Sequence, residues 1–137
     1  MTTNTATHKT RTITMTGRPP VKIREDQWPI TAHGEYSDHD NQYDFQANRK
    51  WQCDIRVRQH ADGRAIVYGV YDYDTAFQNE RGVCAKAGEL LDSADEIIAA
   101  IYSVGTALMS ATEGHDFGGH ISAAMRDAIA DLPAEEL

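Results

Sequence analysis

The segment from Lys50 to Asp74 constrains the fold more than any other part of the 137-residue chain. In its first half, apolar and polar side chains alternate with a period of two, which is typical of a strand with one buried face. The apolar members of this alternation are Trp51, Cys53, Ile55 and Val57. Asp62-Gly63 then supplies the positive backbone angles of a tight turn, and a second strand rich in Val, Ile and Tyr follows. The segment therefore predicts an antiparallel hairpin.

Two registers are open for this hairpin. A two-residue loop at Asp62-Gly63 sets Ile55 opposite Val70, and we expect this register. A three-residue loop that begins at Ala61 shifts the pairing by one residue and exchanges the two faces of the second strand. The residues that then share a face with Ile55 are Val67, Gly69, Tyr71 and Tyr73. In both registers the second strand is apolar on both faces, so it should be central in its sheet and covered on both sides.

Shorter strand patterns precede the hairpin. The predicted strands lie at residues 11–16 and 30–36. The segment 21–27 fits either a strand or one helical turn, because its apolar alternation is mixed with charges. The polar residues 37–41 indicate a loop. Residues 75–88 are mixed in character, and we expect a loop there with a short strand around Val83.

The last third of the chain predicts two helices. Ser93 and Glu96 form a capping box, in which the serine hydroxyl accepts from an early backbone N–H. The helix that follows, 97–111, contains no charged residue, so we expect it to be mostly buried against the sheet. Gly105 at its centre should permit close packing. A second helix is predicted from about His120 to Leu132, ended by Pro133.

Strands first and helices last indicate an α+β fold. We expect an antiparallel sheet of three to five strands, with the central hairpin at about 50–74 and two C-terminal helices packed on one face. Residues 1–10 are predicted to be a disordered tail, and residues 11–137 a single domain. The residues that should be buried together are Trp51, Ile55, Val57, Ile98, Ile101 and Leu108.

The net charge is −8 and it is unevenly distributed. Residues 1–64 hold ten basic and eight acidic side chains, whereas residues 65–137 hold three basic and thirteen acidic ones. The acidic half would repel phosphates, which disfavours nucleic acid as a partner. No apolar run approaches the roughly 20 residues of a membrane helix, and the N-terminus has no secretory core. We therefore expect a cytoplasmic protein without a membrane partner.

Motifs for catalysis or cofactor binding are missing from the sequence. The two cysteines, Cys53 and Cys84, do not make a disulfide framework, and Cys53 should be a small buried side chain. The histidine pairs have neither zincin nor zinc-finger spacing, so we expect no metal and no cofactor. These pairs are His33 with His39 and His115 with His120. We expect a protein that is not an enzyme.

One group of residues on the hairpin is a candidate binding surface. Arginine beside aromatic side chains on a sheet can clamp carboxylates or stack on bases, although such residues also pair with each other to stabilise a sheet. The candidate residues are Arg56, Arg58, Arg64, Tyr71 and Tyr73. If residues 21–28 do not fold over the tyrosines, they form an exposed patch of the kind that binds a second copy of the chain. A homodimer is therefore expected.

The stretches TITMTGRPPVKIREDQWPI and VRQHADGRAIVYG resemble segments of small uncharacterised accessory proteins of bacterial mobile elements, namely plasmids, phages and integron cassettes. The resemblance covers most of the chain from Thr12 and implies an accessory role without a defined activity. The function that we expect is a small acidic binding protein that contacts a partner protein, or itself. Two alternatives stay open: a nucleic-acid or small-ligand binder that uses the arginines and tyrosines of the hairpin, and an inhibitor of a host defence system.

Overall fold

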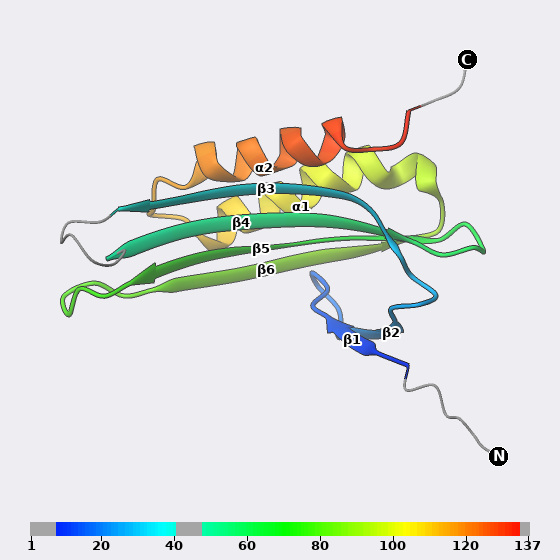
Figure 1. The fold of residues 1–137 in the computed structure, drawn as a ribbon, viewed down its shortest axis with the longest axis horizontal. Helices are drawn as coiled ribbons and strands as arrows, with labels where there is room; N and C mark the ends of the chain where they lie inside the picture. The colour runs from blue at the N-terminus through cyan, green and yellow to red at the C-terminus, as the bar shows by residue number, and fades with distance from the viewer. Residues whose placement is uncertain (1–7, 41–47, 135–137) are drawn as a thin grey trace.

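A four-stranded antiparallel sheet with two helices on one face forms the body of the molecule in the computed structural model, which describes residues 8–40 and 48–134 (Figure 1). The sheet order follows the chain: β3 (Ile30–Asp40), β4 (Arg49–Gln59), β5 (Ala65–Thr75) and β6 (Val83–Leu91). The helices are α1 (Ile97–Ala111) and α2 (Gly118–Ala130), and a separate hairpin consists of β1 (Thr10–Ile13) and β2 (Val21–Arg24). The predicted α+β class is confirmed.

Some predicted boundaries are wrong. β3 continues to Asp40 through residues predicted as a loop, and β6 begins at Val83 and continues to Leu91, well beyond the short strand predicted there. Thr10, the last residue of the predicted tail, already pairs with Arg24 in the β1–β2 hairpin. Residues 1–7 of that tail lie outside the described residues.

The register of the central hairpin is the alternative one, so the favoured two-residue loop is wrong. Gln59 pairs with Ala65, and His60 N–H donates to the Arg64 carbonyl at 2.9 Å across a three-residue loop. A two-residue loop of the favoured type needs positive φ at both loop residues, but only Gly63, at 98°, has it. The Asp62 carboxylate instead accepts from Arg64 N–H. Ile55 consequently lies opposite Gly69 rather than Val70.

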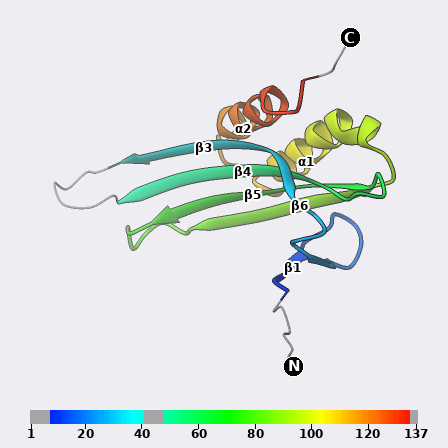
Figure 2. The ribbon, with the colours of Figure 1, turned by 45° about the vertical axis from the view of Figure 1, so that its right-hand side comes forward.

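This register decides which side chains face the helices. The side chains of β5 on the helix face are Val67, Gly69, Tyr71 and Tyr73, which join Cys53, Ile55 and Val57 of β4. Both helices cover this one face, with α2 over β3 and β4 and α1 over β5 and β6 (Figure 2). The prediction of two helices packed on one face is therefore correct.

The predicted core is right except at Ile98 and, in part, Trp51. Ile101 and Leu108 are fully buried, but Ile98 is 50% exposed and Trp51 only partly buried. The buried stripe of α1 repeats at spacings of three and four, and Ile98 lies outside it. The stripe consists of Ile97, Ile101, Val104 and Leu108. The absence of charge in α1 thus reflects an uncharged outer face, where Tyr102 is also exposed, and not burial on all sides.

Glycines let the helices approach their neighbours closely. A Cβ atom on Gly34 of β3 would overlap the backbone of α2 at Ala124 and Ala128. A Cβ atom on Gly105 would overlap the side chain of Met125, so α1 and α2 meet at that glycine, as the sequence predicts. Gly34 is therefore a contact point for α2, and the irregularity of β3 lies earlier, at Ile30 to Ala32.

The β1–β2 hairpin covers one end of the opposite face, which we call the open face (Figures 1 and 2). A second buried cluster forms there around Ile66 of β5. Its other members are Ile13, Met15, Ile23 and Trp28. Thr16 N–H donates to the Gly88 carbonyl at 2.8 Å and ties the hairpin to β6. This covering by residues 21–28 is the intramolecular alternative to a dimer, and it accounts for the apolar residues on the second face of β5.

The outer edge of β3 is occupied by carboxylates from α2. His33 N–H donates to Asp131 Oδ2 at 2.8 Å, and Glu35 N–H donates to Asp127 Oδ2 at 3.0 Å. Both backbone groups point away from β4, where an incoming strand would otherwise pair with them. Helix α2 therefore blocks this edge at His33 and Glu35 as well as covering the sheet.

The loop between β5 and β6 is anchored by Glu80. Its carboxylate accepts from the Arg49 guanidinium at 3.0 and 3.1 Å, from the Tyr73 hydroxyl at 2.9 Å and from the Thr75 hydroxyl at 2.8 Å. These donors, Arg49 first, lower the pKa of Glu80 to about 2. Because the folded-state pKa lies below the unfolded one, Glu80 stabilises the fold above about pH 4.5, and this stabilisation is lost as the pH falls towards 2.

Replacing Glu80 with Gln should therefore lower the urea midpoint at pH 7, with a difference from wild type that narrows between pH 4.5 and pH 2. Urea unfolding at several pH values measures this. Glu113→Gln is the control, because Glu113 is exposed and its side chain forms no ion pair with any described residue. A difference for Glu80→Gln that stayed constant down to pH 2 would contradict the role of its charge.

Candidate functional site

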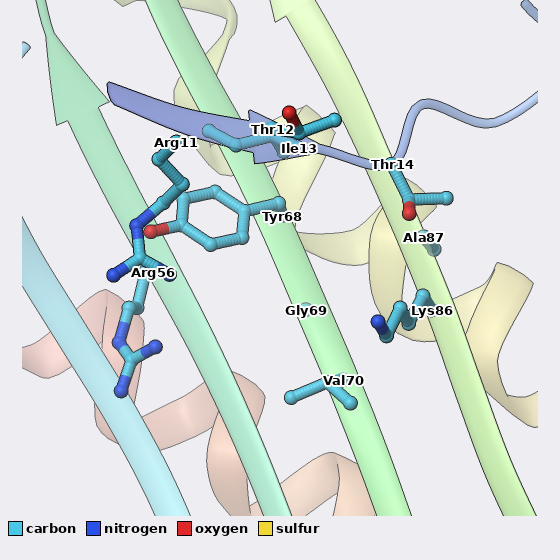
Figure 3. A pocket seen from close by; sticks show the side chains of 10 residues that line it. All are labelled: Arg11, Thr12, Ile13, Thr14, Arg56, Tyr68, Gly69, Val70, Lys86 and Ala87. Atoms are coloured by element: carbon cyan, nitrogen blue, oxygen red, sulfur yellow. The ribbon is translucent and has the colours of Figure 1, made fainter. Parts of the chain in front are cut away.

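A trough of about 180 Å³ opens on the open face where β1 crosses the sheet (Figure 3). Tyr68 and Val70 of β5 form its floor, Arg56 and Lys86 flank them, and Arg11 lies at its upper end. We call these five residues the cationic trough. Its remaining lining residues are Thr12, Ile13, Thr14, Gly69 and Ala87.

Strand pairing positions the trough. Arg56 of β4 lies directly opposite Tyr68, and Lys86 of β6 directly opposite Val70. Directly opposite residues share a face, so all four side chains point away from the helices. β4 and β6 flank β5, which separates the two cations by two strand spacings, roughly 10 Å between backbones.

The cations of the trough differ in their partners. Arg11 Nε donates to Glu25 Oε1 at 2.7 Å and is thus paired. The side chains of Arg56 and Lys86 form no hydrogen bond or ion pair with any residue that the structure describes. Two unpaired cations beside an apolar floor can bind a carboxylate or a phosphate through charge-assisted hydrogen bonds.

Of the predicted site residues, only Arg56 belongs to the trough. Arg58 shares its face but is 4% exposed, and it donates to the Tyr68 hydroxyl at 2.8 Å and to the Trp28 carbonyl at 2.9 Å. Arg58 therefore links the segment at Trp28 to the sheet. This is the sheet-stabilising role that the sequence analysis gave as the alternative to ligand binding. Arg64 pairs with Asp62 at 2.8 Å and lies over the Trp28 ring. Both arginines therefore already have partners within the chain.

Tyr71 and Tyr73 do not form the expected exposed patch. Tyr71 is fully buried on the helix face, where its hydroxyl lies 2.7 Å from His120 Nδ1 and its ring stacks on Phe117. Tyr73 is 9% exposed and donates to Glu80. The one-residue shift in register places both rings under α2 and the loop before it instead of beside Arg56. The predicted dimer surface is therefore wrong.

Sequence reasoning missed Lys86 and Arg11. Lys86 lies in a segment predicted as a loop, although Cys84, Lys86 and the alanines beside them alternate in the manner of a strand. That alternation was the available signal. Arg11 reaches the trough only because the β1–β2 hairpin docks on the sheet, and no local pattern indicates this contact.

Other candidate chemistry is limited. Cys53 is buried as predicted, and burial raises the pKa of its thiol to about 12, so it is not a nucleophile at neutral pH. His120 stacks on Tyr36, and burial lowers its pKa. Among the described residues, one group has side-chain atoms close enough to hold a metal ion. It consists of His33, Glu35 and Asp54.

Comparison of the chain with protein-family models, with curated proteins and with solved structures finds no match. Within the described residues, neither helix has the length and apolar character that crossing a membrane requires.

Proposed function

We propose that the protein is a binding protein without catalytic activity, whose cationic trough holds acidic side chains of a partner protein. The observation that carries this proposal is the pair of unpaired cations, Arg56 and Lys86, on either side of the apolar floor. In a chain of net charge −8, acidic side chains are plentiful, yet none of the described ones lies within ion-pair distance of either cation.

The dimensions of the trough favour a peptide segment over a small molecule. Its volume of about 180 Å³ is below the roughly 300–1,000 Å³ of typical small-molecule sites. Alternate side chains of an extended segment lie on one side, roughly 7 Å apart. Two glutamates at such positions can reach Arg56 and Lys86, while an apolar stem between them covers Val70.

Other partners have less support. Nucleic-acid bases cannot stack on Tyr71 and Tyr73, because both rings are buried on the helix face of the sheet. Glu35, Asp54 and Asp72 also lie on the open face beside the trough, so an occupant must confine its negative charges to the positions of Arg56 and Lys86. A peptide with two spaced glutamates meets this condition, whereas the evenly charged backbone of a nucleic acid does not. Self-association through the same tyrosines is excluded by their burial. A partner protein with an acidic extended segment is therefore the occupant that we propose.

Fluorescence anisotropy with a labelled peptide of alternating Glu and Val tests the proposal. Arg56→Gln combined with Lys86→Gln should weaken binding by more than tenfold. Each substitution removes one charge-assisted contact of about 1.5–3 kcal/mol. The matched control is Arg81→Gln with Arg18→Gln, which removes the same charge from exposed cations outside the trough. A peptide of alternating Lys and Val should not bind.

Two results would contradict the proposal. An equal loss of affinity in the control variant would mean that the peptide responds only to overall charge. Wild-type protein that binds neither peptide below about 1 mM would leave the trough without the proposed occupant, since such an affinity corresponds to only about 4 kcal/mol.

A further inference from the structure

The open face brings two carboxylates and an imidazole together beside the trough. Glu35 of β3 lies directly opposite Asp54 of β4, and like charges at directly opposite positions destabilise a sheet. His33 precedes Glu35 by two residues on the same face, and its Nε2 lies 2.9 Å from Asp54 Oδ1. One ligand atom from each of the three residues lies within 4.8 Å of the others.

The surroundings hold these side chains in place. Asp54 is 7% exposed, and its second oxygen, Oδ2, accepts from Gln52 Nε2 at 2.9 Å, which leaves Oδ1 directed at His33. The backbone N–H groups of His33 and Glu35 are fixed by the α2 carboxylates described above. An outer hydrogen bond on a ligating carboxylate and ligands on rigid strands are typical of preorganised metal sites.

We propose that His33, Glu35 and Asp54 bind a divalent transition-metal ion of the zinc type. One imidazole nitrogen and two carboxylate oxygens are a ligand set that Zn²⁺ accepts, with a water molecule in the fourth position. The ion replaces the hydrogen bond between His33 and Asp54 and removes the repulsion between Asp54 and Glu35. Glu35 is exposed, so its side chain is free to close the remaining distance to the ion.

The sequence could not indicate this site, because Asp54 is far from the other two residues in the chain and only strand pairing brings it to them. Arg56 lies directly opposite His33 on the same face and opposes the ion with its positive charge. Removal of Arg56 should consequently tighten metal binding and weaken peptide binding. The metal site and the peptide trough are therefore separable by experiment.

Isothermal titration of the untagged full chain with ZnCl₂ tests the proposal, supported by the visible absorption of Co²⁺. We expect one ion per chain. Glu35→Gln should weaken affinity at least tenfold, His33→Ala should abolish the Co²⁺ bands, and Arg56→Gln should strengthen affinity several-fold. The matched control is His39→Ala, which removes another exposed histidine from β3 and should change nothing.

Three results would overturn the proposal. The first is no binding at 100 µM ZnCl₂, which would leave the group as an ion pair between His33 and Asp54. The second is unchanged affinity in both Glu35→Gln and His33→Ala, with circular dichroism showing that each variant is folded. The third is an equal loss in His39→Ala, which would indicate binding to scattered surface histidines.

Discussion

Gly34→Ala should lower the free energy of unfolding by about 3 kcal/mol, the upper end of the usual range for overpacked sites. The added Cβ would overlap the α2 backbone at Ala124 and Ala128. A flexible side chain could move aside, but the backbone of a packed helix can give way only if the whole helix shifts. Such a shift of α2 would remove part of its contact with β3.

Urea unfolding monitored by circular dichroism measures this effect. Gly119→Ala is the matched control, because Gly119 lies on the same helix α2 with open space where its Cβ would be. That change should be neutral or stabilise the protein by up to about 1 kcal/mol, since alanine favours a helix over glycine. If the two variants had the same urea midpoint, α2 would not be docked on Gly34.

Ile101→Ala should cost about 2–5 kcal/mol, as expected for truncation of a buried isoleucine. Ile101 is fully buried in the main core, between α1 and the sheet. Its removal leaves a cavity that neighbours from β5 and β6 can fill only in part. The same urea experiment gives the loss directly.

Ile98→Ala is the internal control for this prediction. Both isoleucines are on α1, but Ile98 is 50% exposed and lies outside the buried stripe. Its truncation should change stability by no more than about 0.5 kcal/mol. Equal losses of stability in the two variants would mean that the outer face of α1 is also covered. A loss of stability in Ile98→Ala alone would mean that α1 packs on the sheet with the opposite face.

The sequence predicted the fold class because its strongest local signals are independent of tertiary contacts. The alternation of β4 is present in the structure, and so is the Ser93 half of the predicted capping box. The Ser93 hydroxyl accepts from Asp95 N–H at the start of a 3-10 turn, Ala94–Glu96, that leads into α1, whereas the Glu96 side chain forms no capping hydrogen bond. Only a short strand around Val83 was predicted where β6 runs, because Ala85, Ala87 and Gly88 have weak strand propensity. Gly88 is small because Thr14 and Met15 lie directly over it. The end of β3 was missed because its side chains are polar on both faces and in contact with water.

The candidate site was only partly predictable. Arg56 was identified because β4 has an unambiguous alternation. Tyr71 and Tyr73 were assigned to the wrong surface because a β-strand that is apolar on both faces does not reveal which face turns inward. Only the three-residue loop at Gly63 resolves this, and the difference between the two loops is a single residue.

The carboxylates of Asp127 and Asp131 on the edge of β3 have a consequence for biosynthesis. A ribosome completes β3 well before it reaches residue 127, so the nascent sheet at first displays the N–H groups of His33 and Glu35 without their acceptors. During that interval the exposed backbone is a template for strands of neighbouring chains. Protection against aggregation is therefore acquired late, when the last helix emerges and docks, and a chain truncated before α2 would lack it permanently.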